Sequence, residues 1–248
     1  MRKTGSEAVD ATSRSRFPRR DEDVASTFSP ADYGIAGVCA AAALCVYLST
    51  LAPTVTGEDS GELIAAAYTL GIPHPPGYPL WTMLAHLFTY LPWGTVAWRV
   101  NLVSAVFAAA AVGVLALLLV ALLRGKQEKR GGVWIAAAGG ALVFAFSREF
   151  WEQAVIAEVY TLNAFFFALF LLILWRWRET RGDRLLIIFA VLYGLSLGGH
   201  NTMHLLGPLF ALFVVATERA GLRRWAFYGG LTLIAFLVAL LVYAYLPL

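Results

Sequence analysis

Residues 54–80 form the stretch of this chain whose residue types could do chemistry. Its first part holds three carboxylates, Glu58, Asp59 and Glu62, and its last part holds His74 between prolines. No lysine or arginine interrupts it. A carboxylate can take a proton from a substrate, and a histidine changes charge near neutral pH. The stretch therefore indicates a site for proton transfer on a polar substrate.

The same carboxylates also fit a structural role. Asp59-Ser-Gly-Glu62 has the form of a capping box, followed by a helical pattern that ends at Gly71. Acidic residues in a first turn also suit the helix dipole. Because residues three apart share a helix face, Asp59 and Glu62 point to one side. The pattern is compatible with a helix cap and with a functional pair of carboxylates at the same time.

His74 lies in the sequence Pro-His-Pro-Pro-Gly, residues 73–77. Each proline fixes its own φ and restricts the residue before it, so this histidine has little freedom. Stiffness of this kind could position the imidazole, or it could only turn the chain toward the apolar run at 80–91.

Two further polar groups lie later in the chain. Residues 149–158 contain three glutamates that end with Glu158, and these mark either a site or a solvated helix end. His200 and His204 are four apart, a spacing that pairs of metal ligands use on a helix. Two histidines without a nearby carboxylate are a weak metal signal. This spacing therefore favours a hydrogen-bonding role, and no metal site is predicted.

The composition is that of a membrane protein. Hydrophobic residues make up 59% of the chain and charged residues 14%, whereas soluble domains carry about 25% charged residues. The sequence contains no Walker-type loop, nucleophile elbow or cysteine cluster. Cytosolic nucleotide chemistry and serine hydrolysis are therefore poorly supported, and we expect the lipid bilayer, not nucleic acid, as a partner.

The apolar runs predict an all-α, polytopic transmembrane bundle. Residues 1–31 are polar and are predicted to be a disordered tail, and residues 32–248 form the transmembrane module. The run at 80–91 is too short for a span and is predicted to be an interfacial helix within an outer loop, 53–97. The predicted spans are seven: 34–52, 98–123, 133–147, 159–175, 185–199, 204–217 and 226–246.

The basic residues orient these spans. All but two of the 19 lysines and arginines lie in the tail or in three loops, at 124–130, 176–184 and 219–224. Because cytoplasmic loops carry the excess of basic residues, the N-terminus and these loops are predicted to be cytoplasmic. The two exceptions, Arg99 and Arg148, fall on the outer side together with the acidic residues and histidines. We expect a multi-pass protein of the plasma (inner) membrane with a functional site at its outer face.

Four segments resemble the protein O-mannosyltransferase-like family of GT-C membrane glycosyltransferases. The first is GEDSGELIAAAYTLG at 57–71, followed by HPPGYPL at 74–80. The others are AWRVNL at 97–102, FWEQAVIAEVYTLN at 150–163 and GLSLGGHNTM at 194–203. The resemblance covers residues 32–248. Since relatives continue past such a segment, it implies an N-terminal module of a longer protein.

This resemblance implies an enzyme with a GT-C fold, whose first outer loop carries interfacial helices and a catalytic acidic residue. Such an enzyme moves a sugar, mannose or another hexose, from a polyprenyl-phosphate donor to a hydroxyl of a protein or glycan acceptor at the extracytoplasmic face. The acidic residue matches Asp59, which would act as general base in a single displacement that inverts the anomeric centre, with Glu62 beside it. No cofactor other than this lipid-linked sugar donor is implied.

The leaving phosphate needs positive charge. Arginine suits bidentate phosphate contacts, so we expect Arg99 and Arg148 to bind the donor phosphate. The remaining expected substrate-binding residues are Glu58, His74, Glu158 and His200. The alternative is a non-catalytic transporter, or a lipid-binding or scaffold module, that uses the same outer pocket. Against a transporter, no predicted span carries a charge at mid-depth.

Overall fold

The computed structural model describes residues 28–124, 130–218 and 224–244. The prediction of an all-helical chain is confirmed, because the described residues form helices and no strand. Most of the predicted tail lies outside the described residues, and α1 begins at Pro30. The helices are α1 (Pro30–Thr50), α2 (Ser60–Thr69), α3 (Pro79–Phe88), α4 (Val96–Leu123), α5 (Arg130–Ala145), α6 (Arg148–Ala154), α7 (Tyr160–Thr180), α8 (Asp183–Ser196), α9 (Thr202–Thr217) and α10 (Trp225–Tyr243).

The described helices provide fewer spans than the seven predicted. Four of them, α1, α4, α7 and α10, are long and apolar enough to cross a membrane, and α5 with α6, bent by 67°, would make a fifth. Helix α8 has 14 residues and α9 has 16, whereas a span needs about 20. By length and composition the described residues therefore offer four or five spans, because α8 and α9 are each too short to cross a bilayer alone.

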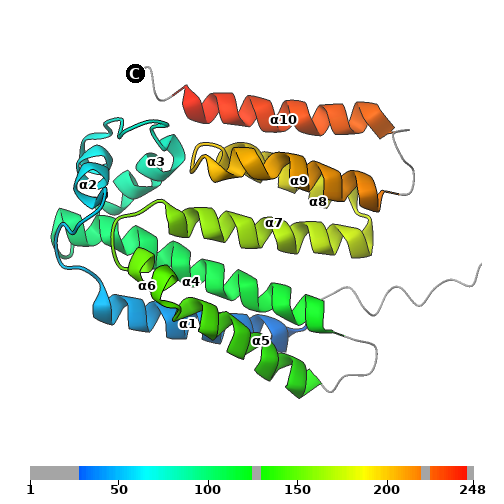
Figure 1. The fold of residues 1–248 in the computed structure, drawn as a ribbon, viewed down its shortest axis with the longest axis horizontal. Coiled ribbons are helices and arrows are strands. Elements are labelled where there is room, and N and C mark those ends of the chain that lie inside the picture. Colours follow the sequence, from blue (N-terminus) through cyan, green and yellow to red (C-terminus); the bar gives the residue numbers. More distant parts are fainter. Residues whose placement is uncertain (1–27, 125–129, 219–223, 245–248) are drawn as a thin grey trace, which may run out of the picture.

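The long helices lie side by side with nearly parallel axes (Figure 1). The C-terminal ends of α4, α7 and α9 lie at one end of the bundle, and α2, α3 and the loops before α7 and α9 lie at the other. This arrangement places the predicted outer loop and the later polar motifs at one common end.

Helix α4 is the central element, and it packs against α1, α5 and α7. Its contact with α1 is close because small residues meet there. A Cβ at Gly113 would lie 3.2 Å from the Ala40 Cβ and 3.3 Å from the Ala36 carbonyl oxygen. Without a hydrophobic driving force between helices in lipid, such close backbone approach is a main source of helix association.

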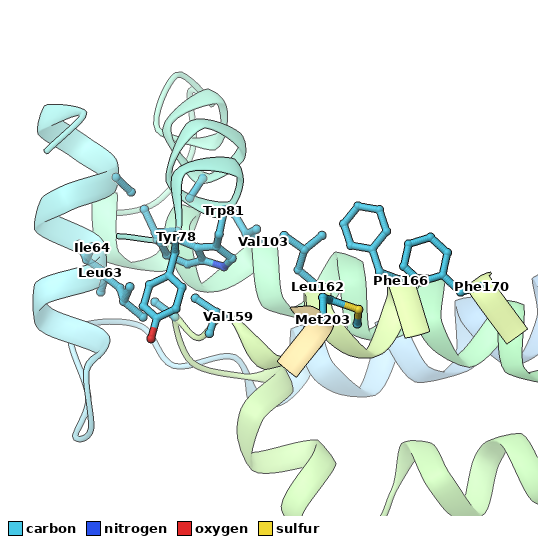
Figure 2. Close-up of a cluster of buried hydrophobic side chains, with 14 of the residues drawn as sticks. Leu63, Ile64, Tyr78, Trp81, Val103, Val159, Leu162, Phe166, Phe170 and Met203 are labelled. Carbon is cyan, nitrogen blue, oxygen red and sulfur yellow. The ribbon is translucent and has the colours of Figure 1, made fainter. Parts of the chain in front are cut away.

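A second core cluster supports the end that carries α2 and α3. Figure 2 shows Trp81 and Tyr78 of this region next to Val103 of α4 and Val159. Trp81 is fully buried. The predicted helix at 80–91 is confirmed as α3, and the exposed Tyr90 and Trp93 follow its end, as expected for aromatic residues at a membrane interface.

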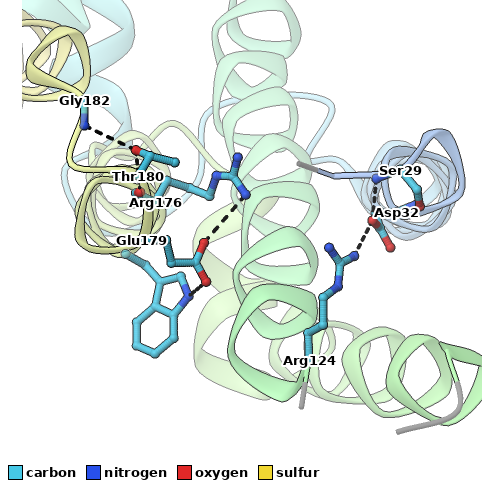
Figure 3. Close-up of polar contacts among 8 residues, drawn as sticks. Ser29, Asp32, Arg124, Arg176, Glu179, Thr180 and Gly182 are labelled. Carbon is cyan, nitrogen blue, oxygen red and sulfur yellow. Dashed lines mark hydrogen bonds and ion pairs between the residues drawn. The ribbon is translucent and has the colours of Figure 1, made fainter. Parts of the chain in front are cut away.

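The opposite end of the bundle is joined by a buried carboxylate, Asp32, in the first turn of α1 (Figure 3). It forms a capping box with Ser29, whose backbone N–H donates to it at 2.6 Å. Arg124 at the end of α4 pairs with the same carboxylate, and the Trp134 indole donates to it at 2.9 Å. This contact set holds α1, α4 and α5 together at the end of the bundle opposite the polar motifs.

Candidate functional site

The site is built around the start of α2. Asp59 occupies the N-cap position, as predicted, but the capping box does not form. Within the described residues 28–124, no backbone N–H of α2 donates a hydrogen bond to the Asp59 side chain. An N-cap side chain reaches the helix from an extended backbone. Asp59 instead has φ −85° and ψ 4°. Its carboxylate is therefore left available for other contacts.

Glu62 pairs with His74 across the loop between α2 and α3. Its carboxylate accepts the His74 backbone N–H at 2.6 Å and the ring Nδ1–H at 3.0 Å. Hydrogen bonds from the His74 ring and backbone lower the pKa of Glu62. The same side-chain hydrogen bond is the main reason that the pKa of His74 is raised. The pair thus favours a carboxylate next to an imidazolium.

Asp59 faces the other side of this imidazole. Its Oδ2 lies 3.8 Å from the His74 Nε2, and its side chain is 58% exposed. The Nε2 atom also lies 3.1 Å from the Tyr78 hydroxyl. Asp59 is therefore an accessible carboxylate beside a histidine whose pKa is raised, and it could accept a proton from a substrate hydroxyl.

Glu158 lies beneath these groups and is only 3% exposed. Its backbone carbonyl accepts hydrogen bonds from Trp81 Nε1 and Ser104 Oγ, each at 3.1 Å. Burial is the largest cause of the rise in the pKa of Glu158 to about 7, and the charges of Glu58 and Asp59 add to it. The expected sugar contact by Glu158 stays a prediction, but its burial favours a role beneath the site.

Glu58 is turned away from His74. Its backbone has φ 56°, in the left-handed region, and its carboxylate accepts a hydrogen bond from Gln153 Nε2 at 3.3 Å. The acidic loop is therefore attached to α6 at this point.

An aromatic wall borders the cluster. The ring of His200 stacks parallel to Tyr78, with centroids 6.1 Å apart, and contacts Tyr160 at 5.3 Å. His200 Nδ1 accepts the Thr202 backbone N–H at 3.1 Å, and burial lowers the pKa of His200. A neutral imidazole with its hydrogen on Nε2 fits these contacts.

Among the contacts of the described residues, neither Arg99 nor Arg148 joins this cluster. Arg99 donates three hydrogen bonds, to the carbonyls of Thr89, Trp93 and Gly94, at 2.7, 2.8 and 2.9 Å. Arg148 donates to Glu152 at 2.9 Å, and its side chain is 83% exposed. Arg148 also borders an open cavity of about 450 Å³ that includes Phe146, Trp151 and Val155.

Asp59, Glu62 and His74 are also the described residues whose donor atoms lie close enough for a cation, within 4.8 Å of one another. Both ring nitrogens of His74 are already engaged, by Glu62 and by Tyr78. The geometry therefore favours the ion pair, and we assign no metal ligands.

Sequence reasoning missed several members of the site. Tyr78 and Tyr160 supply the aromatic wall, and Trp81 and Ser104 hold the backbone of Glu158. For Tyr78 and Tyr160 a signal existed, since both lie inside the motifs at 74–80 and 150–163. Trp81 and Ser104 carry no comparable signal, because their roles depend on contacts with a distant segment.

Comparisons with known proteins agree with the motifs. A family model described as the protein O-mannosyl-transferase TMEM260 N-terminal domain matches residues 59–222. Protein O-mannosyl-transferase TMEM260 of Mus musculus is 38% identical over 214 residues, which are 82% of this chain and 28% of that protein. Protein O-mannosyl-transferase tmem260 of Dictyostelium discoideum is 34% identical over 127 residues, 50% of this chain and 14% of that protein. No solved structure matches the chain.

This chain therefore spans less than a third of the length of these relatives. The matched segment begins at Asp59 and continues through Glu158 and His200. The resemblance expected from the motifs is thereby confirmed: the chain belongs to the family of the protein O-mannosyl-transferase TMEM260 N-terminal domain.

Proposed function

We propose that this chain carries the catalytic acidic residue, acting as general base, of a membrane glycosyltransferase. The enzyme would move mannose or another hexose from a polyprenyl-phosphate donor to an acceptor hydroxyl at the extracytoplasmic face. The names of the mouse and Dictyostelium relatives support the transferase class. The observation that carries the proposal is the carboxylate of Asp59, which is exposed, free of the helix cap and 3.8 Å from the His74 ring.

The reaction requires one proton acceptor. The acceptor oxygen attacks the anomeric carbon and forms the new C–O bond, while the bond from that carbon to the phosphate oxygen breaks. Asp59 takes the hydroxyl proton, and the phosphate leaves with the bonding electrons. A positioned general base contributes about 10²–10⁴-fold to such a step. A single displacement of this kind inverts the anomeric centre, as proposed for the GT-C type.

The remaining residues would bind and orient substrate. The His74 imidazolium, held by Glu62, is one source of positive charge for the donor phosphate, and Arg148 is proposed as a second. The contacts of Arg99 favour a structural role, since three carbonyls already occupy its guanidinium. Glu58 and His200 stay proposed as sugar-binding residues, and Tyr160, whose ring contacts His200, is added to them. Orientation in the plasma (inner) membrane, with the N-terminus cytoplasmic, stays a prediction.

Sugar transfer by the full-length protein in membranes tests the proposal. A panel of radiolabelled polyprenyl-phosphate hexoses is offered with protein and glycan acceptors, and consumption of each donor is measured. We expect the Asp59→Asn variant to lose about 10²–10⁴-fold in turnover while donor binding is kept. Glu149→Gln is the matched control, because Glu149 is an exposed glutamate of α6 outside the cluster.

Two outcomes contradict the proposal in different ways. Near-normal turnover by Asp59→Asn rejects this residue as the base. Binding of polyprenyl-phosphate hexoses by the unaltered protein without any consumption instead favours the non-catalytic lipid-binding alternative.

A further inference from the structure

Tyr78 is fixed where the loop after α2 meets α3. Its backbone has φ 40°, a left-handed conformation that residues with a side chain rarely adopt, and its carbonyl accepts the Thr82 N–H at 2.9 Å. The residue is 8% exposed and belongs to the core cluster of Figure 2, in which its hydroxyl oxygen points away from the cluster. Its ring also stacks on His200, with an interplanar angle of 3°. A side chain held in this way presents its hydroxyl at a defined place.

That hydroxyl lies beside His74. The distance from the Tyr78 oxygen to the His74 Nε2 atom is 3.1 Å, and the two rings meet edge to face with centroids 5.3 Å apart. On the other side of the imidazole, Glu62 is 3.0 Å from Nδ1. An imidazolium has two N–H groups. Glu62 and Tyr78 therefore occupy both of them.

Asp59 is a competing acceptor for the Nε2–H group. Its Oδ2 atom lies 3.8 Å from Nε2, which is beyond hydrogen-bond distance. The hydrogen bonds that the structure describes for residues 28–124 include none between His74 and Asp59. A charge-assisted hydrogen bond from an imidazolium stabilises a carboxylate and makes it a weaker proton acceptor. The phenol of Tyr78 takes the N–H group without adding charge, because burial raises the pKa of Tyr78 and keeps its hydroxyl neutral.

We propose that Tyr78 is a positioning residue, whose hydroxyl occupies the His74 Nε2–H group and keeps it from a hydrogen bond to the Asp59 carboxylate. Asp59 thereby stays beside the histidine but keeps its oxygen lone pairs for the substrate hydroxyl. This inference rests on the proposed function, because it takes Asp59 as the base. It gives the two ends of Tyr78 separate roles, since the ring stacks on His200 and the hydroxyl binds His74.

The charges around the pair predict what removal of the hydroxyl does. The titratable groups that act on His74 or Tyr78 are Asp59 and Glu62 at the start of α2, Glu158 before α7 and Tyr160 in its first turn. Without the hydroxyl, Asp59 is the nearest described carboxylate for the Nε2–H group, and its exposed side chain can close the 3.8 Å gap. A second carboxylate hydrogen bond raises the pKa of His74, whereas loss of the Tyr78 acceptor alone lowers it. The sign of the change therefore separates the proposed role from a merely structural one.

Tyr78→Phe removes the hydroxyl and keeps the ring. NMR titration of the histidine rings in lipid nanodiscs, with His74 assigned by His74→Gln, measures the effect. We expect the pKa of His74 to rise in Tyr78→Phe, and we expect no rise when Tyr78→Phe is combined with Asp59→Asn.

The chain offers a matched control in Tyr90→Phe. The Tyr90 hydroxyl lies 2.9 Å from the Nε2 atom of His86, which is also four residues away, and the two rings meet edge to face with centroids 5.0 Å apart. This variant loses the same kind of hydrogen bond outside the acidic cluster. It should leave the pKa of His74 unchanged.

Transfer kinetics provide the second measurement. We expect kcat at saturating donor to fall by about tenfold in Tyr78→Phe, because a base that already accepts a strong hydrogen bond takes the substrate proton less readily. Tyr90→Phe should keep the rate of the unaltered protein.

A further comparison leaves Tyr78 in place, so it also serves if Tyr78→Phe fails to fold. In the unaltered protein Glu62 is hydrogen-bonded to His74 and Asp59 is not. Glu62→Gln should therefore lower the pKa of His74 more than Asp59→Asn does. An equal decrease in the two variants would mean that Asp59 already holds the ring, and the inference would be wrong.

The inference would also be overturned if the pKa of His74 fell or stayed constant in Tyr78→Phe, or if its rise persisted without the Asp59 carboxylate. A normal kcat in Tyr78→Phe despite the rise would show that the hydroxyl does not protect the base. Failure of the proposed function is distinguishable, because the unaltered protein would then consume no donor while the titration result still stood.

Discussion

Glu62 accepts two hydrogen bonds from a single residue, His74, one from the backbone N–H at 2.6 Å and one from ring Nδ1 at 3.0 Å. The two residues are 12 apart in the sequence, so the contact fixes the loop against the first turn of α2. It also directs the opposite ring nitrogen toward Asp59, 3.8 Å away. One carboxylate thereby holds the histidine that borders the candidate base in position and raises its pKa.

Replacing Glu62 by Gln should lower the pKa of His74. The Glu62 hydrogen bond is the main cause that raises this pKa, and a neutral amide favours the imidazolium less. The ring is charged below its raised pKa and loses charge as pH rises through it, so in Glu62→Gln this loss should occur at lower pH. NMR titration of the histidine rings, with His74 assigned by His74→Gln, measures the shift. Identical His74 titration curves in Glu62→Gln and in the unaltered protein would contradict the role of Glu62 in raising this pKa.

Substitution of Asp59 by Ala should have little effect on stability. Loss of a working N-cap costs about 1 kcal/mol, but Asp59 makes no cap hydrogen bond to α2. We therefore expect a loss below about 0.5 kcal/mol, the range of ordinary surface changes. Thermal unfolding of Asp59→Ala against the unaltered protein measures it. A loss of the full capping magnitude would mean that the carboxylate caps the helix in solution.

Arg99 should matter for stability more than for donor binding. Its guanidinium is hydrogen-bonded to three backbone carbonyls around the end of α3. Since Lys cannot reproduce this planar set of donors, Arg99→Lys should lose about 1–3 kcal/mol of stability with donor KM unchanged. Arg148→Lys is the comparison, because Arg148 is exposed and is proposed to contact phosphate. It should raise donor KM and leave the unfolding temperature as it was. If Arg99→Lys instead raised donor KM and Arg148→Lys lost stability, Arg99 would be the donor-binding residue and Arg148 the structural one.

Glu158 should make the protein less stable as pH rises. Its pKa is raised from 4.5 to about 7 in the folded chain, so between these values the folded state binds a proton that the unfolded state has released. Stability should then fall by about 1.4 kcal/mol per pH unit, and the loss should be complete above pH 7. Glu158→Gln cannot ionise and should lack this fall. Unfolding of both proteins at pH 5 and pH 8 tests it, and parallel pH dependence would argue against a protonated Glu158.

Much of this protein follows from local sequence. Apolar runs predict the helical membrane class, because hydrocarbon admits only segments that satisfy their own backbone hydrogen bonds. The start of α2 after Asp59 and the short helix after Pro79 follow from side-chain type and spacing over a few residues. The motifs at 57–80 and 150–163 predict the family and most of the residues near Asp59. These features are readable because each depends on neighbours along the chain.

The use of each side chain depends instead on the partners that the folded chain brings to it. Glu62 fits a capping box by spacing, yet it bonds His74. Glu158 resembles any glutamate at a solvated helix end, yet it is buried, and Trp81 and Ser104 donate hydrogen bonds to its backbone carbonyl. Arg99 has the residue type for phosphate binding, yet three carbonyls at the end of α3 occupy it. A polar group forms hydrogen bonds with the partner that packing brings within reach and shields from water. For Glu158 the partners come from helices 54 and 77 residues away in the chain, whereas Glu62 bonds a residue 12 positions away across a loop.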